Sequence, residues 1–132
     1  MTAMHLCRSI AEKGEDAMRK WSVMLGATAA YNLVVALPGL FAVGASISER
    51  IVALLVGCFG LLYALISRDP LRLAPALWAG IVGKIGVVAL MGPEAASGRA
   101  APGTGLILAG DALFTVLFLI FLLGPGRRKS GA

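Results

Sequence analysis

Residues 104–123 form a long apolar segment, TGLILAGDALFTVLFLIFLL. Asp111 is its one charged residue, and the side chains around it are almost all apolar. An α-helix rises about 1.5 Å per residue, so a helix of this length crosses about 30 Å of hydrocarbon. The stretch therefore predicts a transmembrane helix.

Three more apolar stretches precede this one, and each is long enough to span a bilayer. The first lies within a charge-free run that begins at Trp21, an aromatic residue suited to the membrane interface. We expect Pro38 to kink the outer third of that helix, because proline lacks the amide hydrogen that the helix ladder uses. The predicted spans lie at about 22–43, 47–66, 71–91 and 104–123.

Short polar segments mark where the predicted spans begin and end. Ser46, followed three residues later by Glu49, has the pattern of a capping box at the start of the second span. The tripeptide 68–70, Arg-Asp-Pro, is expected to form a tight turn before the third span. Gly92-Pro93 is expected to end that span, and the Gly-, Ala- and Pro-rich residues 92–103 are expected to form a loop.

The composition points to the same class of protein. The chain has 132 residues, of which 58% are hydrophobic and 14% are charged, and its mean hydropathy is +0.86. Soluble domains carry about 25% charged residues, so these values exclude a soluble single-core domain. They also exclude a disordered chain and a disulfide-stapled secreted module. We therefore predict a small integral membrane protein, whose first partners are membrane lipids.

The N-terminal segment, residues 1–21, carries many charges but also has an apolar face. Helical spacing places its apolar residues on one side, namely Leu6, Ile10, Ala17 and Trp21. This pattern predicts a short amphipathic helix lying at the membrane interface, and a plain solvated tail is the alternative. The chain then divides into this segment, a four-helix transmembrane domain at 22–123 and a basic cytoplasmic tail at 124–132.

The connections between the predicted spans are short, so consecutive helices should pack as antiparallel neighbours. The predicted fold class is all-α: an integral membrane four-helix up-and-down bundle with a short N-terminal amphipathic interfacial helix. A three-span chain is the alternative, and its Lys and Arg residues would be less unevenly distributed between the two sides of the membrane.

Lysine and arginine are unevenly distributed between the two sides of four predicted spans. One side holds Arg8, Lys13, Arg19, Lys20, Arg68, Arg72, Arg127, Arg128 and Lys129, and the other holds Arg50 and Arg99. The positive-inside rule then places both termini in the cytoplasm of a bacterial inner membrane. Because the basic residues gather at span ends and do not alternate with aromatic residues, no nucleic-acid partner is expected.

Two ionisable residues, Lys84 and Asp111, lie inside predicted spans. Each costs about 2.5–3.5 kcal/mol near the centre of a helix, so such residues usually face other helices and pair. Lys84 precedes Met91 and Asp111 follows Thr104 by the same number of residues, which puts both about 10 Å below the outer boundary. We therefore predict a Lys84–Asp111 ion pair in the outer half of the bundle.

This predicted pair has two interpretations. It either fixes helix pairing and register, or it relays protons or ions or holds the polar head of a ligand; a third outcome is that the pair does not form. Thr115 lies one helical turn after Asp111, and Asn32 in the first span is expected to make an interhelical hydrogen bond.

Other chemistry-bearing residues are few. His5 and Cys7 form a His-x-Cys pair without further ligands, so neither a metal nor a cofactor is expected. Cys58 is interpreted as a small buried apolar residue. The chain has no Ser-His-Asp set and no paired carboxylates at one site, so no catalytic residue is assigned.

Several of these residues recur in one order along the chain. They are Tyr31-Asn32, Gly60, Tyr63, Arg68-Asp69-Pro70, Gly83-Lys84 and Gly110-Asp111. In this the chain resembles a class of small bacterial four-span membrane proteins, most of them uncharacterised, over about residues 31–122. In general shape it is also similar to the DoxX-type four-helix proteins. The resemblance implies that Lys84, Asp111 and Asn32 act as a set, with Tyr31 beside them, and it implies no particular activity.

Three functions follow as hypotheses. The first is a non-enzymatic membrane protein that binds a partner or small ligand, as an accessory subunit of a larger membrane complex. The second is a small ion- or proton-coupled transporter, working as a homo-oligomer, in which Lys84 and Asp111 couple transport. The third is a membrane enzyme acting on a lipid or quinone-like substrate, with Asp111 and Tyr63 as acid–base candidates; their different depths argue against a shared site.

Overall fold

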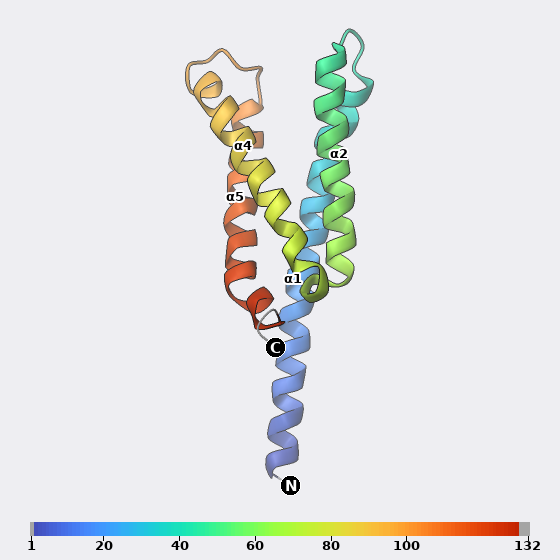
Figure 1. Ribbon diagram of the computed structural model, residues 1–132, viewed down its shortest axis with the longest axis vertical. Helices are drawn as coiled ribbons and strands as arrows, with labels where there is room; N and C mark the ends of the chain where they lie inside the picture. The colour runs from blue at the N-terminus through green and yellow to red at the C-terminus, as the bar shows by residue number, and fades with distance from the viewer. Residues whose placement is uncertain (1, 130–132) are drawn as a thin grey trace. The chain divides into compact units, whose positions relative to one another are not determined.

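The computed structural model describes residues 2–129, which form helices and turns with no strand among them. The long helices are α1 (Thr2–Phe41), α2 (Ile47–Arg68), α4 (Leu77–Ala96) and α5 (Thr104–Leu123). They form two compact units, one ending at Pro70 and the other beginning at Leu71. The first is a hairpin of α1 and α2, and the second is a hairpin of α4 and α5 (Figure 1). The all-helical class is confirmed, and the packing of all four helices into one bundle stays a prediction.

Four helical stretches are long and apolar enough to cross a membrane. They are Thr2–Phe41, Ile47–Arg68, Pro70–Ala96 and Thr104–Leu123. All four carry large apolar side chains on exposed faces, such as Val34, Leu61, Val82 and Leu113. Apolar surface of this extent on a soluble monomer would be an aggregation hazard, whereas lipid covers it at no cost.

Helix α1 is one uninterrupted helix of 40 residues. This differs from the expected short amphipathic helix at 1–21, because no break separates that segment from the first predicted span. The segment lacks proline, and ion pairs along its surface support the helix: Arg8 with Glu12 at 3.0 Å and Arg19 with Asp16 at 2.7 Å. Pro38 is accommodated inside the last turn of α1.

The turn between α1 and α2 is built from local hydrogen bonds. Ser46 accepts a bond from the Glu49 amide at 3.2 Å, and the Glu49 carboxylate accepts one from the Ser46 amide at 2.7 Å. The predicted capping box is thus confirmed. The Arg50 guanidinium donates to the carbonyl oxygens of Leu40, Ala42 and Ala45 at 3.2–3.4 Å, which caps the end of α1.

Small residues let α1 and α2 approach closely. A Cβ atom added at Gly60 would lie 3.2 Å from the Ala29 carbonyl oxygen and 3.0 Å from Cγ of Leu33. Farther along, a Cβ added at Gly39 would lie 3.0 Å from Cβ of Ala53. The first hairpin therefore depends on glycine and alanine at its helix contacts, as membrane helices commonly do.

The third predicted span differs from the structure at both ends. It starts as α3 (Pro70–Leu73) and the 3₁₀ helix η1 (Ala74–Ala76), with Pro75 in the first turn of η1, before α4 begins. The predicted end at Gly92-Pro93 is wrong, because α4 continues to Ala96. Proline removes only one ladder bond so near a helix end, which explains the continuation.

The loop between α4 and α5 is correspondingly shorter than expected, spanning residues 97–103. The Arg99 guanidinium binds both carboxylate oxygens of Glu94, at 2.9 and 3.1 Å. This contact raises the pKa of Arg99 above its ordinary value. Gly103, with φ of 87°, adopts the left-handed conformation just before α5.

Helix α5 has the bounds expected for the fourth span, and the 3₁₀ helix η2 (Pro125–Lys129) follows it. The predicted basic tail at 124–132 is described only as far as Lys129; the rest of it lies outside the described residues.

Candidate functional site

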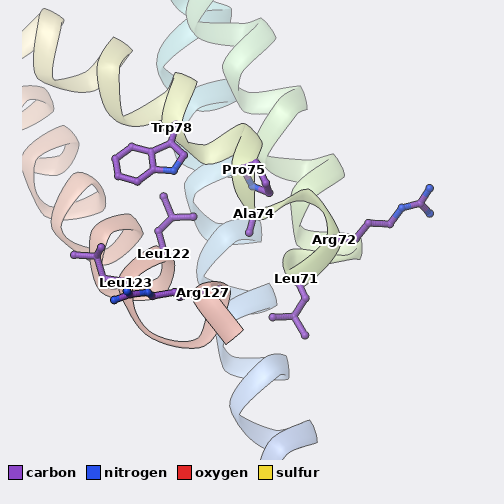
Figure 2. A pocket seen from close by; sticks show the side chains of 9 residues that line it. Leu71, Arg72, Ala74, Pro75, Trp78, Leu122, Leu123 and Arg127 are labelled. Carbon is purple, nitrogen blue, oxygen red and sulfur yellow. The ribbon is translucent and has the colours of Figure 1, made fainter. Parts of the chain in front are cut away.

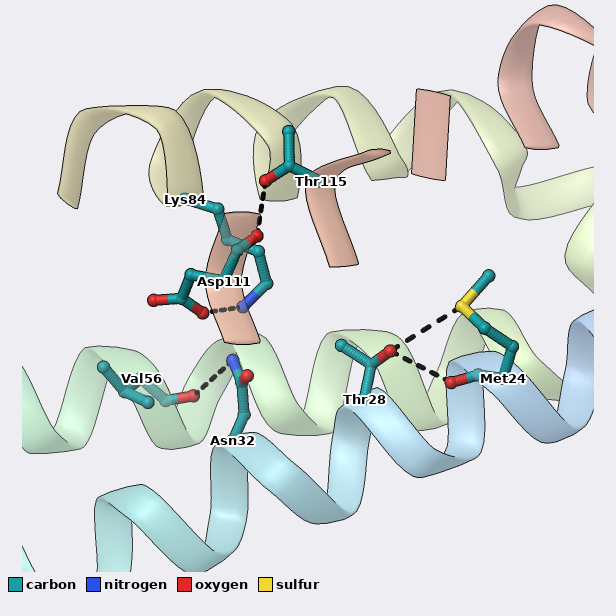
Figure 3. A network of polar contacts seen from close by, with 7 residues as sticks. All are labelled: Met24, Thr28, Asn32, Val56, Lys84, Asp111 and Thr115. Atoms are coloured by element: carbon teal, nitrogen blue, oxygen red, sulfur yellow. Dashed lines mark hydrogen bonds and ion pairs between the residues drawn. The ribbon is translucent and has the colours of Figure 1, made fainter. Parts of the chain in front are cut away.

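Lys84 on α4 and Asp111 on α5 form an ion pair between Nζ and Oδ1 (Figure 3). The two side chains are 6% and 11% exposed. A buried pair of opposite charges satisfies both groups where a single charge would be strongly unfavourable. The structure therefore brings together two of the candidate residues, 27 positions apart in the chain.

Helical periodicity puts this pair on the buried faces of its two helices. On α4 the buried residues are Leu77, Gly80, Ile81 and Lys84, and on α5 they include Leu108, Asp111, Thr115, Phe118 and Leu122. These sets repeat at intervals of three, four and seven residues, as one face of an α-helix does. Each ionisable side chain is thus a polar interruption in an apolar face.

Two neighbours on α5 lie close to the pair. The Thr115 hydroxyl donates to the Asp111 carbonyl oxygen at 2.8 Å, so this hydroxyl stays within its own helix. The Phe114 ring centroid lies 5.8 Å from Nζ of Lys84, a distance at which the ring face attracts a cation. The lysine ammonium is therefore held by a carboxylate and by an aromatic ring.

Asn32 lies in the other hairpin. Its side-chain amide donates to the Val56 carbonyl oxygen at 3.4 Å, and so joins α1 to α2. One turn earlier on α1, the Thr28 hydroxyl donates to the Met24 carbonyl oxygen at 3.0 Å (Figure 3). Tyr31, next to Asn32, is half-buried. The candidate residues thus fall into two groups, with Lys84, Asp111 and Thr115 in the second hairpin and Asn32 and Tyr31 in the first.

The remaining chemistry-bearing residues are dispersed. Cys7 and Cys58 are both free and exposed, so the interpretation of Cys58 as a buried apolar residue is wrong. The reason is its position on an outward face of α2. Tyr63 is fully buried on α2, in the hairpin that does not contain Asp111. Among the described residues, no cluster of three or more His, Cys, Asp and Glu side chains could hold a metal.

One feature was missed by the sequence analysis: an apolar groove of about 490 Å³ in the second hairpin (Figure 2). Trp78, Leu122 and Leu123 line it, together with two arginines, Arg72 and Arg127. The available signal was a tryptophan, Trp78, about two helical turns inside a predicted span whose cytoplasmic end is basic.

No protein-family model, no curated protein and no solved structure matches this chain. The resemblance to small bacterial four-span proteins therefore stays a prediction.

Proposed function

We propose that this chain is a small, non-enzymatic integral membrane protein with four spans and both termini in the bacterial cytoplasm. It binds a partner or small ligand within the membrane, as an accessory subunit of a larger complex. The observation that carries the proposal is the Lys84–Asp111 pair on the buried faces of two helices whose other faces are apolar and exposed. Membership of the small four-span class that the sequence resembles is part of the same proposal.

Charge at the helix ends supports the orientation. The two basic residues assigned to the outer side both have local roles: Arg50 caps α1, and Arg99 binds Glu94. These contacts explain why two arginines lie on the side assigned as outer. The remaining Lys and Arg residues outside the spans all lie on the side assigned to the cytoplasm, which strengthens the asymmetry that the positive-inside rule uses.

The bonding of the polar groups supports a binding role over a catalytic one. Lys84 and Asp111 bind each other, and the hydroxyls of Thr28 and Thr115 bind backbone oxygens of their own helices. Among the described residues, every fully buried side-chain nitrogen and oxygen has a partner. Such groups fix helix pairing and register, and they leave the apolar outer faces to meet lipid or another protein.

Mild-detergent purification of the tagged chain from its native membrane tests the proposal, with a tagged unrelated four-span protein as control. We expect larger membrane proteins to co-purify with this chain and not with the control. Val116→Trp on α5 and Leu61→Trp on α2 each place a bulky side chain at an exposed position. The variant in which co-purification falls identifies the helix that contacts the partner. Recovery only as a lone monomer or homodimer would contradict the proposed accessory role.

A second candidate function is ion- or proton-coupled transport. The observation that favours it is the Lys84–Asp111 pair, two ionisable groups that lie inside the predicted spans. In this case Asp111→Asn abolishes pH-dependent flux in liposomes without unfolding the protein. Glu94→Gln makes the same chemical change outside the predicted spans and should leave flux unchanged. Absence of flux in the wild-type protein, or equal flux in Asp111→Asn, would eliminate this function.

A further inference from the structure

The N-terminal half of α1 carries an exposed apolar face. At about 100° per residue, all apolar side chains of residues 3–18 fall on one side of the helix and all polar side chains on the other. Five residues along the middle of the apolar side define this N-terminal face: Ala3, Cys7, Ile10, Gly14 and Ala17. They follow one another at alternating intervals of four and three residues, a spacing typical of helices that pair along their length.

The N-terminal face continues the face of α1 that packs against α2. Leu25 and Asn32, both buried in the first hairpin, lie about five helical turns after Cys7 and Gly14 respectively, and so point in the same directions. In Figure 1, α2 runs beside the later part of α1 and not beside its N-terminal part. One part of a single helix-packing face is thus covered by α2, and the other part is exposed.

Large apolar side chains make this exposure unfavourable in water. Leu6, beside the N-terminal face, is 63% exposed, and Ile10 within it is 62% exposed. Burial against another apolar surface would remove both from water. Because the face is straight and has the spacing of a paired helix, a second helix with the same spacing fits it.

The charges beside the N-terminal face indicate which helix this is. Lys13 and Glu15 flank the face on opposite sides, because residues two apart in a helix point away from each other. None of the ion pairs between described residues includes either of them. The other acidic residues of this segment, Glu12 and Asp16, already bind arginines of the same helix. One positive and one negative side chain thus stand at the two edges of the face.

Two parallel copies of α1 would match these charges. When parallel helices pair face to face, opposite edges meet, so Lys13 of each copy lies near the level of Glu15 of the other. A twofold axis makes this contact twice. In an antiparallel pair like edges would meet, and Lys13 and Lys20, which share an edge, would face lysines. Two copies inserted in one membrane with the same topology also run parallel, so charge and topology favour the same arrangement.

We propose that the N-terminal halves of α1 from two copies of this chain pair as a parallel helical dimer. A crossing angle of about 20°, usual for such pairs, separates the helices towards the membrane and leaves room for α2 of each copy. The membrane confines both copies to one plane, which raises their effective concentration and allows a short helix pair to form. The inference rests on the proposed membrane insertion and adds a second copy to the proposed complex.

Oxidative cross-linking at Cys7 in native membranes tests the pairing. Cys58→Ala leaves Cys7 as the only thiol, near the middle of the N-terminal face. A brief treatment with copper phenanthroline should convert most of this variant to a disulfide-linked dimer. The matched control adds Cys7→Ala and Ser9→Cys, which moves the thiol to the polar side of the same turn, and should form several-fold less dimer. The helix pair forms reversibly, so Cys7 remains open to slower labelling by a maleimide.

Charge reversal tests the predicted contacts between the two copies. Lys13→Glu or Glu15→Lys alone places like charges at both contacts and should lower cross-linking at Cys7 about five-fold. The two changes combined in one chain restore opposite charges and should restore cross-linking. Co-expression of the two single variants should favour the mixed dimer over either homodimer. Glu12→Lys makes the same change of charge on the polar side and should leave cross-linking unchanged.

Each outcome has a distinct meaning. Equal dimer formation by the Cys7 and Ser9→Cys chains, or no restoration by the double charge reversal, would overturn the proposed dimer. Cross-linking of Cys7 to a protein other than this chain would also overturn it, since another partner would then cover the N-terminal face. Loss of the chain from the membranes during an alkaline carbonate wash would instead show that it is not inserted, which contradicts the proposed function itself.

Discussion

Lys84 on α4 and Asp111 on α5 form an ion pair, and each is the only ionisable residue on the buried face of its helix. The other buried side chains on these two faces are apolar, except for Thr115, whose hydroxyl bonds within its own helix. Each of the two charges alone would make the insertion of this hairpin into lipid unfavourable. Neutralisation by a partner within one folded unit removes the penalty that either charge alone would carry.

This pairing predicts strong non-additivity. Lys84→Met or Asp111→Leu alone leaves one buried charge without its partner and should lower the free energy of unfolding by about 3–5 kcal/mol. The double variant removes both charges and should be close to wild type. Unfolding in mixed detergent micelles measures all four proteins. A double variant as unstable as the sum of the single changes would show that the two groups do not interact.

The close contact of α1 and α2 gives a second prediction. Gly60→Ala places a methyl group against Leu33 and the backbone of Ala29, and should destabilise the first hairpin by about 1–3 kcal/mol. Gly26→Ala on α1 is the matched control, because nothing lies within 4 Å of its added Cβ. The same unfolding measurement applies, and equal effects of the two substitutions would contradict the described packing.

The two cysteines provide a third prediction about membrane insertion. Both thiols are exposed in the folded chain, Cys7 near the start of α1 and Cys58 in the middle of α2. If α2 spans a bilayer, lipid covers Cys58, so a membrane-impermeant maleimide should label Cys7 and not Cys58. Single-cysteine variants, with the other residue replaced by alanine, separate the two signals.

The side of labelling also reports orientation. In sealed spheroplasts, Cys7 should react only after the membrane is permeabilised, because both termini are assigned to the cytoplasm. A cysteine introduced at Ser97, in the α4–α5 loop, should react in intact spheroplasts. Labelling of Cys7 from outside would reverse the topology, and labelling of Cys58 in membranes would exclude α2 as a span.

A fourth prediction concerns the cap that Arg50 forms on α1. Arg50→Gln removes the bonds to the carbonyl oxygen of Leu40, in the last turn of that helix, and to those of Ala42 and Ala45, in the turn that follows. Amide hydrogen exchange in the last turn of α1 should therefore accelerate. Arg99→Gln, which removes a comparable charge from the other loop, should leave exchange in that turn unchanged. Equal protection in all three proteins would show that the cap has no effect.

Some features of this structure can be predicted from short segments of the sequence. The start of α2 could be predicted because Ser46 and Glu49 satisfy each other's amides without help from other segments. The bounds of α5 follow from glycine at positions 103 and 124, on either side of an apolar run. The depth argument also paired the two residues that the structure brings together, Lys84 and Asp111.

Other features depend on contacts or on energy differences that a pattern does not reveal. An amphipathic segment and an apolar span share the same helical period, so the sequence did not show that α1 passes through Trp21 without a break. Proline near a helix end has a small cost, so Pro93 did not end α4. The groove at Trp78 required the tertiary approach of residues on either side of the hairpin, including Arg72 and Arg127.

The unbroken course of α1 has a mechanical consequence. A rod of 40 residues is about 60 Å long, roughly twice what a bilayer core accommodates. Its charged N-terminal half is therefore a rigid extension of the half that would be embedded in lipid. A tilt of the embedded half by about 10° would sweep the far tip through about 5 Å, so small movements within the bilayer would be magnified at the tip.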